Sequence, residues 1–181
     1  MGQGTAADLR SAQRVLCYGA TGSGKSTTAT MLGELLGLPV VLVDEICWLP
    51  GWQKRDPDQQ HEILTGLLSE PSWVFDSVYS SEREYALQRA DVIVALDYPR
   101  ALSLWRLLRR TERRIRTAEL VCNGNIETWR HTLARDSIIW WHFHSWRIKR
   151  QRMRAWYADS DAPPVILLRR PRDLRRLVAQ L

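Results

Sequence analysis

The stretch "GATGSGKS" occupies residues 19–26 and opens on the glycine that ends the short apolar run "RVLCYG" at 14–19. It matches the pattern G-x-x-x-x-G-K-[ST] in full and lies where a strand gives way to a helix, the context that this pattern requires. Its glycines let the backbone wrap a phosphate group at the start of the helix, where N–H groups and the helix dipole favour negative charge. We therefore expect a phosphate-binding P-loop in an α/β fold.

The loop and the first helical turn are expected to hold a nucleotide. Lys25 is expected to reach its β- and γ-phosphates, and the Ser26 hydroxyl to ligate Mg²⁺. A chance glycine-rich turn is the competing interpretation, and the flanking strand and helix argue against it. The expected nucleotide-binding residues here are Gly19, Thr21, Gly22, Ser23, Gly24, Lys25, Ser26 and Thr27.

Strand-like and helix-like stretches alternate along the chain. Continuous Val, Ile and Leu runs are typical of strands buried on both faces, and strands separated by helices form parallel sheets with right-handed crossovers. The pattern predicts a three-layer α/β sandwich of P-loop NTPase type, as a single domain over 1–181. The predicted strands are 14–19, 39–44, 73–77, 92–97 and 163–170.

Helix-end signals support this division. Gly37 is a natural C-terminal stop for the helix after the P-loop, and Asp56 before Pro57 is a typical N-cap. A long helix is predicted from Pro99 to about Arg116, with Asp97 as a structural cap before it. The segment 117–127 is the strongest candidate for a mobile flap.

Composition narrows the class of protein. The chain has 181 residues, of which 45% are hydrophobic, enough for a core. No run approaches the roughly 18 apolar residues of a membrane span, and the N-terminal segment has no secretory pattern. Three scattered cysteines predict neither a disulfide framework nor a zinc site. The reducing cytoplasm is the expected location.

The positive charge is unevenly distributed. The net charge is +6, and the segment 100–154 carries 14 Lys and Arg against 4 Asp and Glu, a local excess of 10. Such a segment is expected to meet a polyanion, either a nucleotide or a nucleic acid. A solvated helix face is the alternative explanation.

Two carboxylates are predicted to follow neighbouring strands at the same edge of the sheet. Asp44 closes "PVVLVD" and Asp76 closes "WVFD". Ligands of open parallel sheets bind at this edge, so both side chains are expected near the P-loop. One carboxylate can hold Mg²⁺, which we assign to Asp76 with Ser26, and the other can accept a proton from an attacking hydroxyl or orient it, which we assign to Asp44. An N-cap or turn role is the alternative for each.

Three further patterns bear on the site. The stretch "WLPGW" at 48–52 can shape an apolar acceptor pocket or plug the sheet edge, and the sequence does not decide between them. The run "RLLRRTERRIR" at 106–116 aligns arginines that can clamp phosphates. The aromatic run at 138–146 is expected to pack in the core or against a helix rather than to stack on bases, and its two histidines point to different faces, so no metal pair is expected.

With these residues in hand, the chain resembles the adenylate-kinase-like P-loop family catalogued as DNA topology modulation proteins. The likeness covers nearly the whole chain and includes "LVDEICWLPGW", "WVFDSVY", "ADVIVALDYPRALSLWRLLRR", "NGNIE" and "SIIWWHFHSWRIKR". It implies a nucleoside-monophosphate-kinase fold with five parallel strands in the order 2-3-1-4-5. It also implies binding of ATP and Mg²⁺, and a mobile arginine-bearing lid, here an insertion at about 109–137.

The resemblance also implies roles for single residues. An acid after the second strand contacts the acceptor, here Asp44, and an arginine after the fourth strand stacks on adenine, here Arg106. The loop at 169–172 cups the base, with Arg170 as the contact. The lid arginines lie within 109–116, with Arg109 and Arg113 as the catalytic pair.

One departure affects the acceptor. The family reads Asp-Gly-Asn-Tyr after the third strand, whereas this chain reads "DSVY", with Ser77 and Val78. The missing glycine and amide leave the identity of the acceptor open.

Three functions remain to be compared. The favoured one is an ATP-dependent kinase that acts on a nucleotide, a nucleoside or another small acceptor. The alternative is an ATP-binding protein that associates with nucleic acid through 100–154 and has no kinase activity. A nucleotide switch is disfavoured because no Asn-Lys-x-Asp base-reading motif is present.

Overall fold

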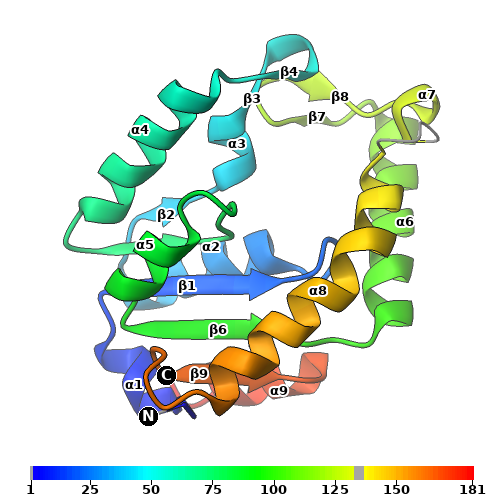
Figure 1. Cartoon of the computed structure of the whole chain (residues 1–181). Coiled ribbons are helices and arrows are strands. Elements are labelled where there is room, and N and C mark those ends of the chain that lie inside the picture. The colour runs from blue at the N-terminus through cyan, green and yellow to red at the C-terminus, as the bar shows by residue number, and fades with distance from the viewer. Residues whose placement is uncertain (1, 133–136) are drawn as a thin grey trace.

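The computed structural model describes residues 2–132 and 137–181 and is built around a five-stranded parallel sheet (Figure 1). Its strands lie in the order β2-β5-β1-β6-β9, which is 2-3-1-4-5 among the sheet strands, as predicted. The central register pairs Val15 with Val74 on one side and with Val92 on the other. The strands are β1 (Arg14–Gly19), β2 (Val40–Val41), β5 (Trp73–Phe75), β6 (Val92–Leu96) and β9 (Val165–Leu168).

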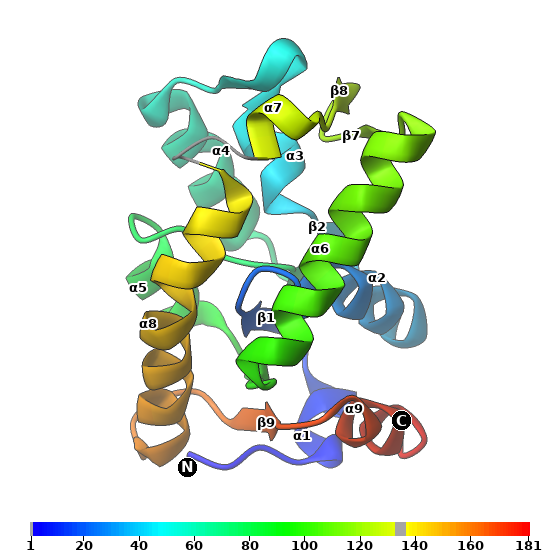
Figure 2. The same cartoon turned by 90° about the vertical axis from the view of Figure 1, so that its right-hand side faces the viewer.

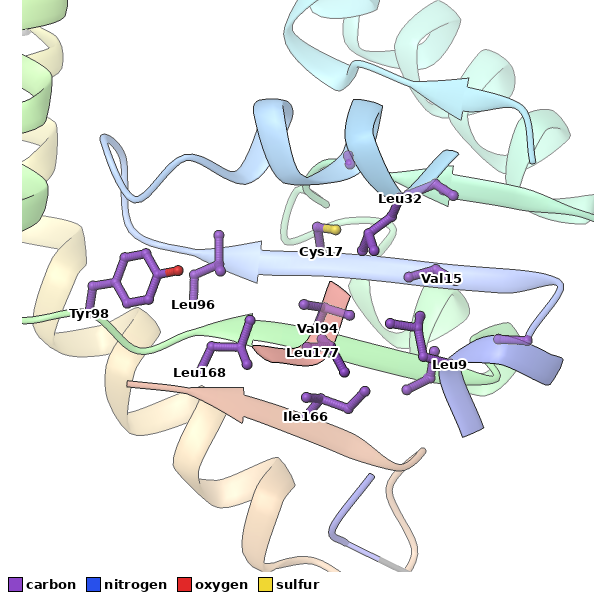
Figure 3. Close-up of a cluster of buried hydrophobic side chains, with 14 residues drawn as sticks. Leu9, Val15, Cys17, Leu32, Val94, Leu96, Tyr98, Ile166, Leu168 and Leu177 are labelled. Carbon is purple, nitrogen blue, oxygen red and sulfur yellow. The ribbon is translucent and has the colours of Figure 1, made fainter. Parts of the chain in front are cut away.

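Helices cover both faces of the sheet, so the three-layer prediction is confirmed (Figure 2). One face packs on α1 (Ala6–Ser11), α2 (Lys25–Leu36) and α9 (Pro171–Val178). Figure 3 shows that core, where Leu9, Leu32 and Leu177 from the helices meet alternate residues of β1, β6 and β9. Burial of these side chains away from water is the main force that holds this layer on the sheet.

The opposite face packs on four helices. They are α3 (Val43–Cys47), α4 (Pro57–Ser69), α5 (Arg83–Arg89) and α8 (Ile138–Ala158). Leu64 and Leu68 of α4 and Met153 of α8 lie in one buried cluster with Leu16 and Phe75 of the sheet. Continuous apolar strands are therefore explained by burial on both sides.

The remaining elements lie outside these layers. Helix α6 (Arg100–Thr117) runs beside α8, and two small antiparallel hairpins lie near α3, away from the sheet (Figure 1). Among the described residues, no helix is long and apolar enough to cross a membrane. The short elements are β3 (Trp48–Leu49), η1 (Pro50–Trp52), β4 (Gln53–Lys54), β7 (Leu120–Val121), β8 (Asn125–Ile126) and α7 (Trp129–Thr132).

Two helix-end predictions are confirmed. Gly37 ends α2 in the left-handed region at φ 68°, and its N–H donates to the Gly33 carbonyl. Asp56 caps α4 by accepting from the N–H groups of Asp58 and Gln59. Residues 133–136, which belong to the expected 109–137 insertion, lie outside the described residues.

Two expectations need correction. The second strand ends at Val41, and Asp44 lies in the first turn of α3, because the chain turns into that short helix directly after the sheet. Asp97 does not cap α6 by a hydrogen bond; it is buried and pairs with Arg150 at 2.9 Å and Arg154 at 3.0 Å, both on α8. The segment 117–127 contains the β7–β8 hairpin, whose turn places Cys122, Asn123 and Gly124 at positive φ, and its role as a mobile flap stays a prediction.

The aromatic run at 138–146, expected in the core or against a helix, does not lie in the core, although Phe143 contacts Arg100 of α6 at 4.4 Å. Trp140, Trp141 and Phe143 are 60%, 53% and 45% exposed, whereas His142 and Ser145 on the same helix are buried. The buried residues in the first part of α8 are therefore polar, and His142 lies against the P-loop, whereas Met153 farther along the helix packs in the apolar cluster.

Candidate functional site

The P-loop conformation requires its glycines. Gly22 and Gly24 have φ values of 78° and 96°, in the left-handed region that side chains disfavour. A Cβ atom on Gly22 would also lie 2.2 Å from the Ser103 carbonyl oxygen and 2.9 Å from Leu107 Cβ. The loop can therefore approach α6 closely only because residue 22 has no side chain.

Two helices hold the P-loop between them, and Figure 2 shows the loop after β1 framed by α6 and α8. From α6, Arg106 Nη1 donates to the Ser23 carbonyl at 3.2 Å. From α8, His142 Nδ1 lies 2.9 Å from the Thr21 carbonyl, and because a carbonyl only accepts, Nδ1 carries the proton. Burial lowers the pKa of His142, which keeps its ring neutral. Sequence reasoning missed this contact because nothing local to α8 indicates the loop as its partner.

Ser26 and Asp76, the predicted magnesium ligands, are brought together. The Ser26 hydroxyl donates to Asp76 Oδ2 at 2.5 Å, and Asp76 Oδ1 accepts from the Val43 N–H at 3.0 Å. Asp76 is 2% exposed. No group of three or more His, Cys, Asp or Glu able to hold a metal occurs among the described residues. A hydroxyl and one carboxylate suit Mg²⁺, which keeps several waters and takes its other ligands from phosphates.

Lys25 lies within this arrangement. Its Nζ donates to the Ala20 carbonyl at 3.2 Å, inside the loop. Burial lowers the pKa of Lys25, the nearby carboxylates of Asp76 and Asp44 raise it, and Arg110 lowers it. The side chain is thus placed where a phosphate chain on the loop would meet it, with two acids close by.

Asp44 faces this region from α3 and is exposed, so a substrate can reach it. The Tyr79 hydroxyl lies 3.4 Å from Asp44 Oδ1 and donates to it. Burial and then the charge of Asp44 raise the pKa of Tyr79, so this phenol stays protonated. Tyr79 directly follows Ser77 and Val78, the two residues at which the chain departs from the family pattern. No role for Tyr79 was predicted from the sequence.

The arginines of α6 divide between two faces. Arg109 lies over the Trp105 ring at 5.0 Å, and Arg113 is 64% exposed and pairs with Glu119 at 2.9 Å. Arg110 instead shares the face of Ser103 and Leu107, at spacings of three and seven residues. The catalytic roles expected for Arg109 and Arg113 stay predictions, and their contacts in this structure lie elsewhere.

Arg110 is the arginine that the structure adds to the site. Burial lowers its pKa, as does Arg114, whereas Glu127 and Asp44 raise it. Its Nε is buried and has no hydrogen-bond partner among the residues that the structure describes. The packing of α6 against its neighbours decides which arginine points inward, and the sequence alone does not show how α6 is rotated.

The expected adenine contacts are placed as follows. Arg106 lies 5.5 Å from the centroid of the Tyr98 ring, beside the P-loop. Arg170 is exposed, and its backbone N–H donates to Asp173 Oδ2 at 2.7 Å at the start of α9. The roles of Arg106 and Arg170 with a base stay predictions.

The stretches "WLPGW" and "NGNIE" interlock, although about 75 residues separate them. Asn125 Oδ1 accepts from the Trp52 N–H at 2.7 Å, and its Nδ2 donates to the Leu49 carbonyl at 3.0 Å. Asn123 Nδ2 donates to the Trp48 carbonyl at 2.7 Å, and Trp52 Nε1 donates to the Ile126 carbonyl at 3.0 Å. The hairpin that the sequence predicted as a flap is thus docked beside α3, which carries Asp44.

Solved structures of several small-molecule kinases are similar to this chain in fold. Shikimate kinase from Acinetobacter baumannii, in complex with shikimate, has a TM-score of 0.57 and 19% identity over 97% of this chain and 93% of that one. The chain has the fold of these enzymes. A gluconokinase from Sinorhizobium meliloti 1021 has a TM-score of 0.52 and 15% identity, with 92% and 87% covered. Deoxyadenosine kinase from M. mycoides has a TM-score of 0.53 and 13% identity, with 92% and 94% covered.

Sequence comparison adds nothing to this assignment. No protein-family model matches the chain, and no curated protein sequence matches it. At these identities the structural likeness shows the fold alone. The resemblance to DNA topology modulation proteins stays a prediction from the sequence.

Proposed function

We propose that the chain is a kinase that transfers the γ-phosphoryl group of Mg-ATP to a small-molecule acceptor. The observation that carries the proposal is the meeting of a complete P-loop, the Ser26–Asp76 pair and the exposed acid Asp44 at one edge of the sheet. The kinase fold supports it, since the neighbours act on a sugar acid, a cyclic hydroxy acid and a nucleoside according to their names.

The donor side follows from the P-loop. Its backbone N–H groups and the start of α2 bind the phosphates, and Lys25 neutralises charge on the β- and γ-phosphates. Ser26 and Asp76 would hold Mg²⁺, which neutralises charge on the same phosphates when it is bound. The positions of these groups are set before the nucleotide arrives, because Asp76 is tied to Val43 and Ser26.

The acceptor side is assigned to α3 and α6. Asp44 accepts the proton of the attacking hydroxyl or orients that hydroxyl toward the γ-phosphorus. Tyr79 donates to Asp44 and so fixes its carboxylate. Arg110, buried and without a partner for its Nε among the described residues, supplies positive charge toward the same space. Transfer in this scheme depends on placement and charge stabilisation.

The alternative, an ATP-binding protein that associates with nucleic acid, has weaker support. Several basic residues of 100–154 have partners within the chain: Arg114 pairs with Glu127, and Arg150 and Arg154 pair with Asp97. Arg106 and Arg110 are directed to the P-loop and its surroundings. These contacts explain part of the basic excess without a nucleic acid.

The test is a transfer assay with γ-labelled ATP and Mg²⁺. Candidate acceptors are nucleosides, nucleoside monophosphates, sugars, sugar acids and hydroxy acids, with short oligonucleotides as the alternative substrate class. We expect a labelled small-molecule product with the wild-type chain and none with Lys25→Ala. Lys54→Ala is the matched control, because it removes a lysine from β4 outside the P-loop. Transfer that survives Lys25→Ala would contradict the mechanism.

A further inference from the structure

Helix α8 directs one face toward the P-loop and the core. His142, Ser145 and Met153 are buried and are spaced by three and eight residues, which places them on one side of the helix. His142 contacts the Thr21 carbonyl, and Met153 packs in the core against the sheet. Lys149 lies between them at the same helical phase, so its side chain belongs to the inward face.

The surroundings of Lys149 confirm that it points inward. Its Nζ lies 6.0 Å from the centroid of the Tyr18 ring, and Tyr18 is the last residue but one of β1, directly before the P-loop. From the next turn of α8, Arg152 Nη1 donates to the Tyr18 hydroxyl at 2.8 Å. The cation is therefore held beside the end of the strand that leads into the phosphate-binding loop.

Asp44 and Asp76 lie in the surroundings of Lys149, but neither of them forms an ion pair with it. Within 2–132 and 137–181 it forms no ion pair with Asp or Glu. The pKa of Lys149 is lowered to about 7: burial is the largest cause, repulsion from Lys25 also lowers the pKa, and the charge of Asp44 raises it. The charged and titratable groups that face it are Lys25, Asp44, Asp76 and Arg152, together with His142 and Tyr18.

Lys25 and Lys149 carry like charges that repel each other, and Asp44 and Asp76 offset only part of this repulsion because neither lysine forms an ion pair within 2–132 and 137–181. Lys25 reaches from the P-loop and Lys149 from α8 into the same region. An anion bound there would relieve the repulsion and would be held from two sides. We expect Lys25 to contact the β- and γ-phosphates of a nucleotide bound on the P-loop. Of these two groups, the γ-phosphate is the one that Lys149 can reach as well.

We propose that Lys149 binds the γ-phosphate of ATP from the α8 side, so that the transferred phosphoryl group lies between Lys25 and Lys149. This inference rests on the proposed function. In the transfer step the acceptor oxygen forms a bond to the γ-phosphorus, and the bond to the β–γ bridging oxygen breaks. ADP leaves with that electron pair, and the hydroxyl proton passes to Asp44. Lys149 keeps its protons and stabilises the charge on the equatorial oxygens.

The test compares ADP with the non-hydrolysable analogue adenylyl imidodiphosphate, both with Mg²⁺, by calorimetric binding. Lys149→Met should raise the Kd of the analogue about tenfold or more, the loss of one charged hydrogen bond, and should leave the Kd of ADP unchanged. Arg147→Met removes the same charge from an exposed position of α8 and should change neither. Lys149→Arg should retain most of the discrimination.

A second measurement uses the unaltered chain. It contains three lysines, so ¹³Cε labelling of lysine gives three resonances that single variants assign. The Lys149 resonance should shift on addition of the analogue and not of ADP. An equal response to both nucleotides, or equal Kd changes in Lys149→Met, overturns the inference and leaves the kinase proposal intact. Failure of the wild-type chain to bind either nucleotide overturns both.

Discussion

The side-chain amide of Asn125 joins two distant loops, because its Oδ1 accepts from the Trp52 N–H at 2.7 Å. The same side chain donates to the Leu49 and Cys122 carbonyls. Asn125 is 3% exposed, so these backbone groups have no water to replace it. The hairpin after α6 and the segment after α3 are thereby held as one unit near Asp44.

Replacement of this amide should destabilise the chain. Asn125→Ala leaves the Trp52 N–H and the Leu49 carbonyl unpaired in a buried place, which costs about 1–3 kcal/mol of unfolding free energy. Asn125→Asp keeps the acceptor for Trp52 but turns a carboxylate oxygen toward two carbonyls, so its loss should be at least as large. Urea unfolding measures both. Wild-type stability in either variant would show that the two loops are not joined as described.

The P-loop glycine at position 22 should not tolerate a side chain. Gly22→Ala brings Cβ to 2.2 Å from the backbone oxygen of Ser103 at a positive φ, so the loop must move away from α6. We expect loss of nucleotide binding in a calorimetric titration and a lower melting temperature. Gly66→Ala in α4 is the control: nothing lies within 4 Å of its Cβ, and the helix should gain about 0.5–1 kcal/mol. Nucleotide affinity retained in Gly22→Ala would contradict this account of the loop.

Replacement of Asp44 should lower the rate of phosphoryl transfer to the acceptor and should not change the binding of ATP. Asp44→Asn removes the group that accepts the proton, so the transfer rate should fall about a hundredfold or more. The Kd of ATP should stay unchanged, because in the proposed complex the phosphates contact the loop and not α3. Glu45→Gln changes the neighbouring exposed acid and should leave both quantities alone. If transfer and ATP binding fall together in Asp44→Asn, the assignment of Asp44 to the acceptor is wrong.

Stability should depend on pH through Lys149. Its pKa is lowered to about 7 from an ordinary value of 10.5, so between these values the unfolded chain binds a proton that the folded chain has lost. The contribution of this group to unfolding free energy therefore rises with pH across that interval. Lys149→Met should be most stabilising, relative to wild type, near pH 7 and should lose that advantage toward pH 10. The titratable and charged groups that face residue 149 are the same in the wild type and in Lys149→Met: Lys25, Asp44, Asp76, Arg152, His142 and Tyr18. A difference independent of pH from 7 to 10 would refute the assignment.

The strands of the sheet and the position of the P-loop could be predicted from the sequence because their signals are local, whereas the order of the strands was implied by the family resemblance. The P-loop pattern, the apolar runs and the caps at Gly37 and Asp56 each occupy a few consecutive residues. The Ser26–Asp76 pairing follows once both are placed at the same sheet edge.

The rest depends on packing between segments far apart in the sequence. Arg110 points inward because Ser103 and Leu107 on the same face meet the loop at Gly22, and the arginine spacing alone fits Arg109 and Arg113 equally well. The sequence around Asp97 predicts a cap for the helix that follows it, whereas the partners of Asp97 lie on α8. Lys149 belongs to no sequence motif, and its position beside the end of β1 depends on how α8 packs against the sheet.

The most direct test of the central claim is a crystal structure of the chain with Mg²⁺ and adenylyl imidodiphosphate. We predict that the triphosphate lies on the backbone N–H groups of 22–26, with Mg²⁺ held by Ser26 and Asp76 and with Asp44 facing the γ-phosphate. A complex in which the nucleotide binds elsewhere, or in which Asp44 faces away from the γ-phosphate, would contradict the proposed kinase.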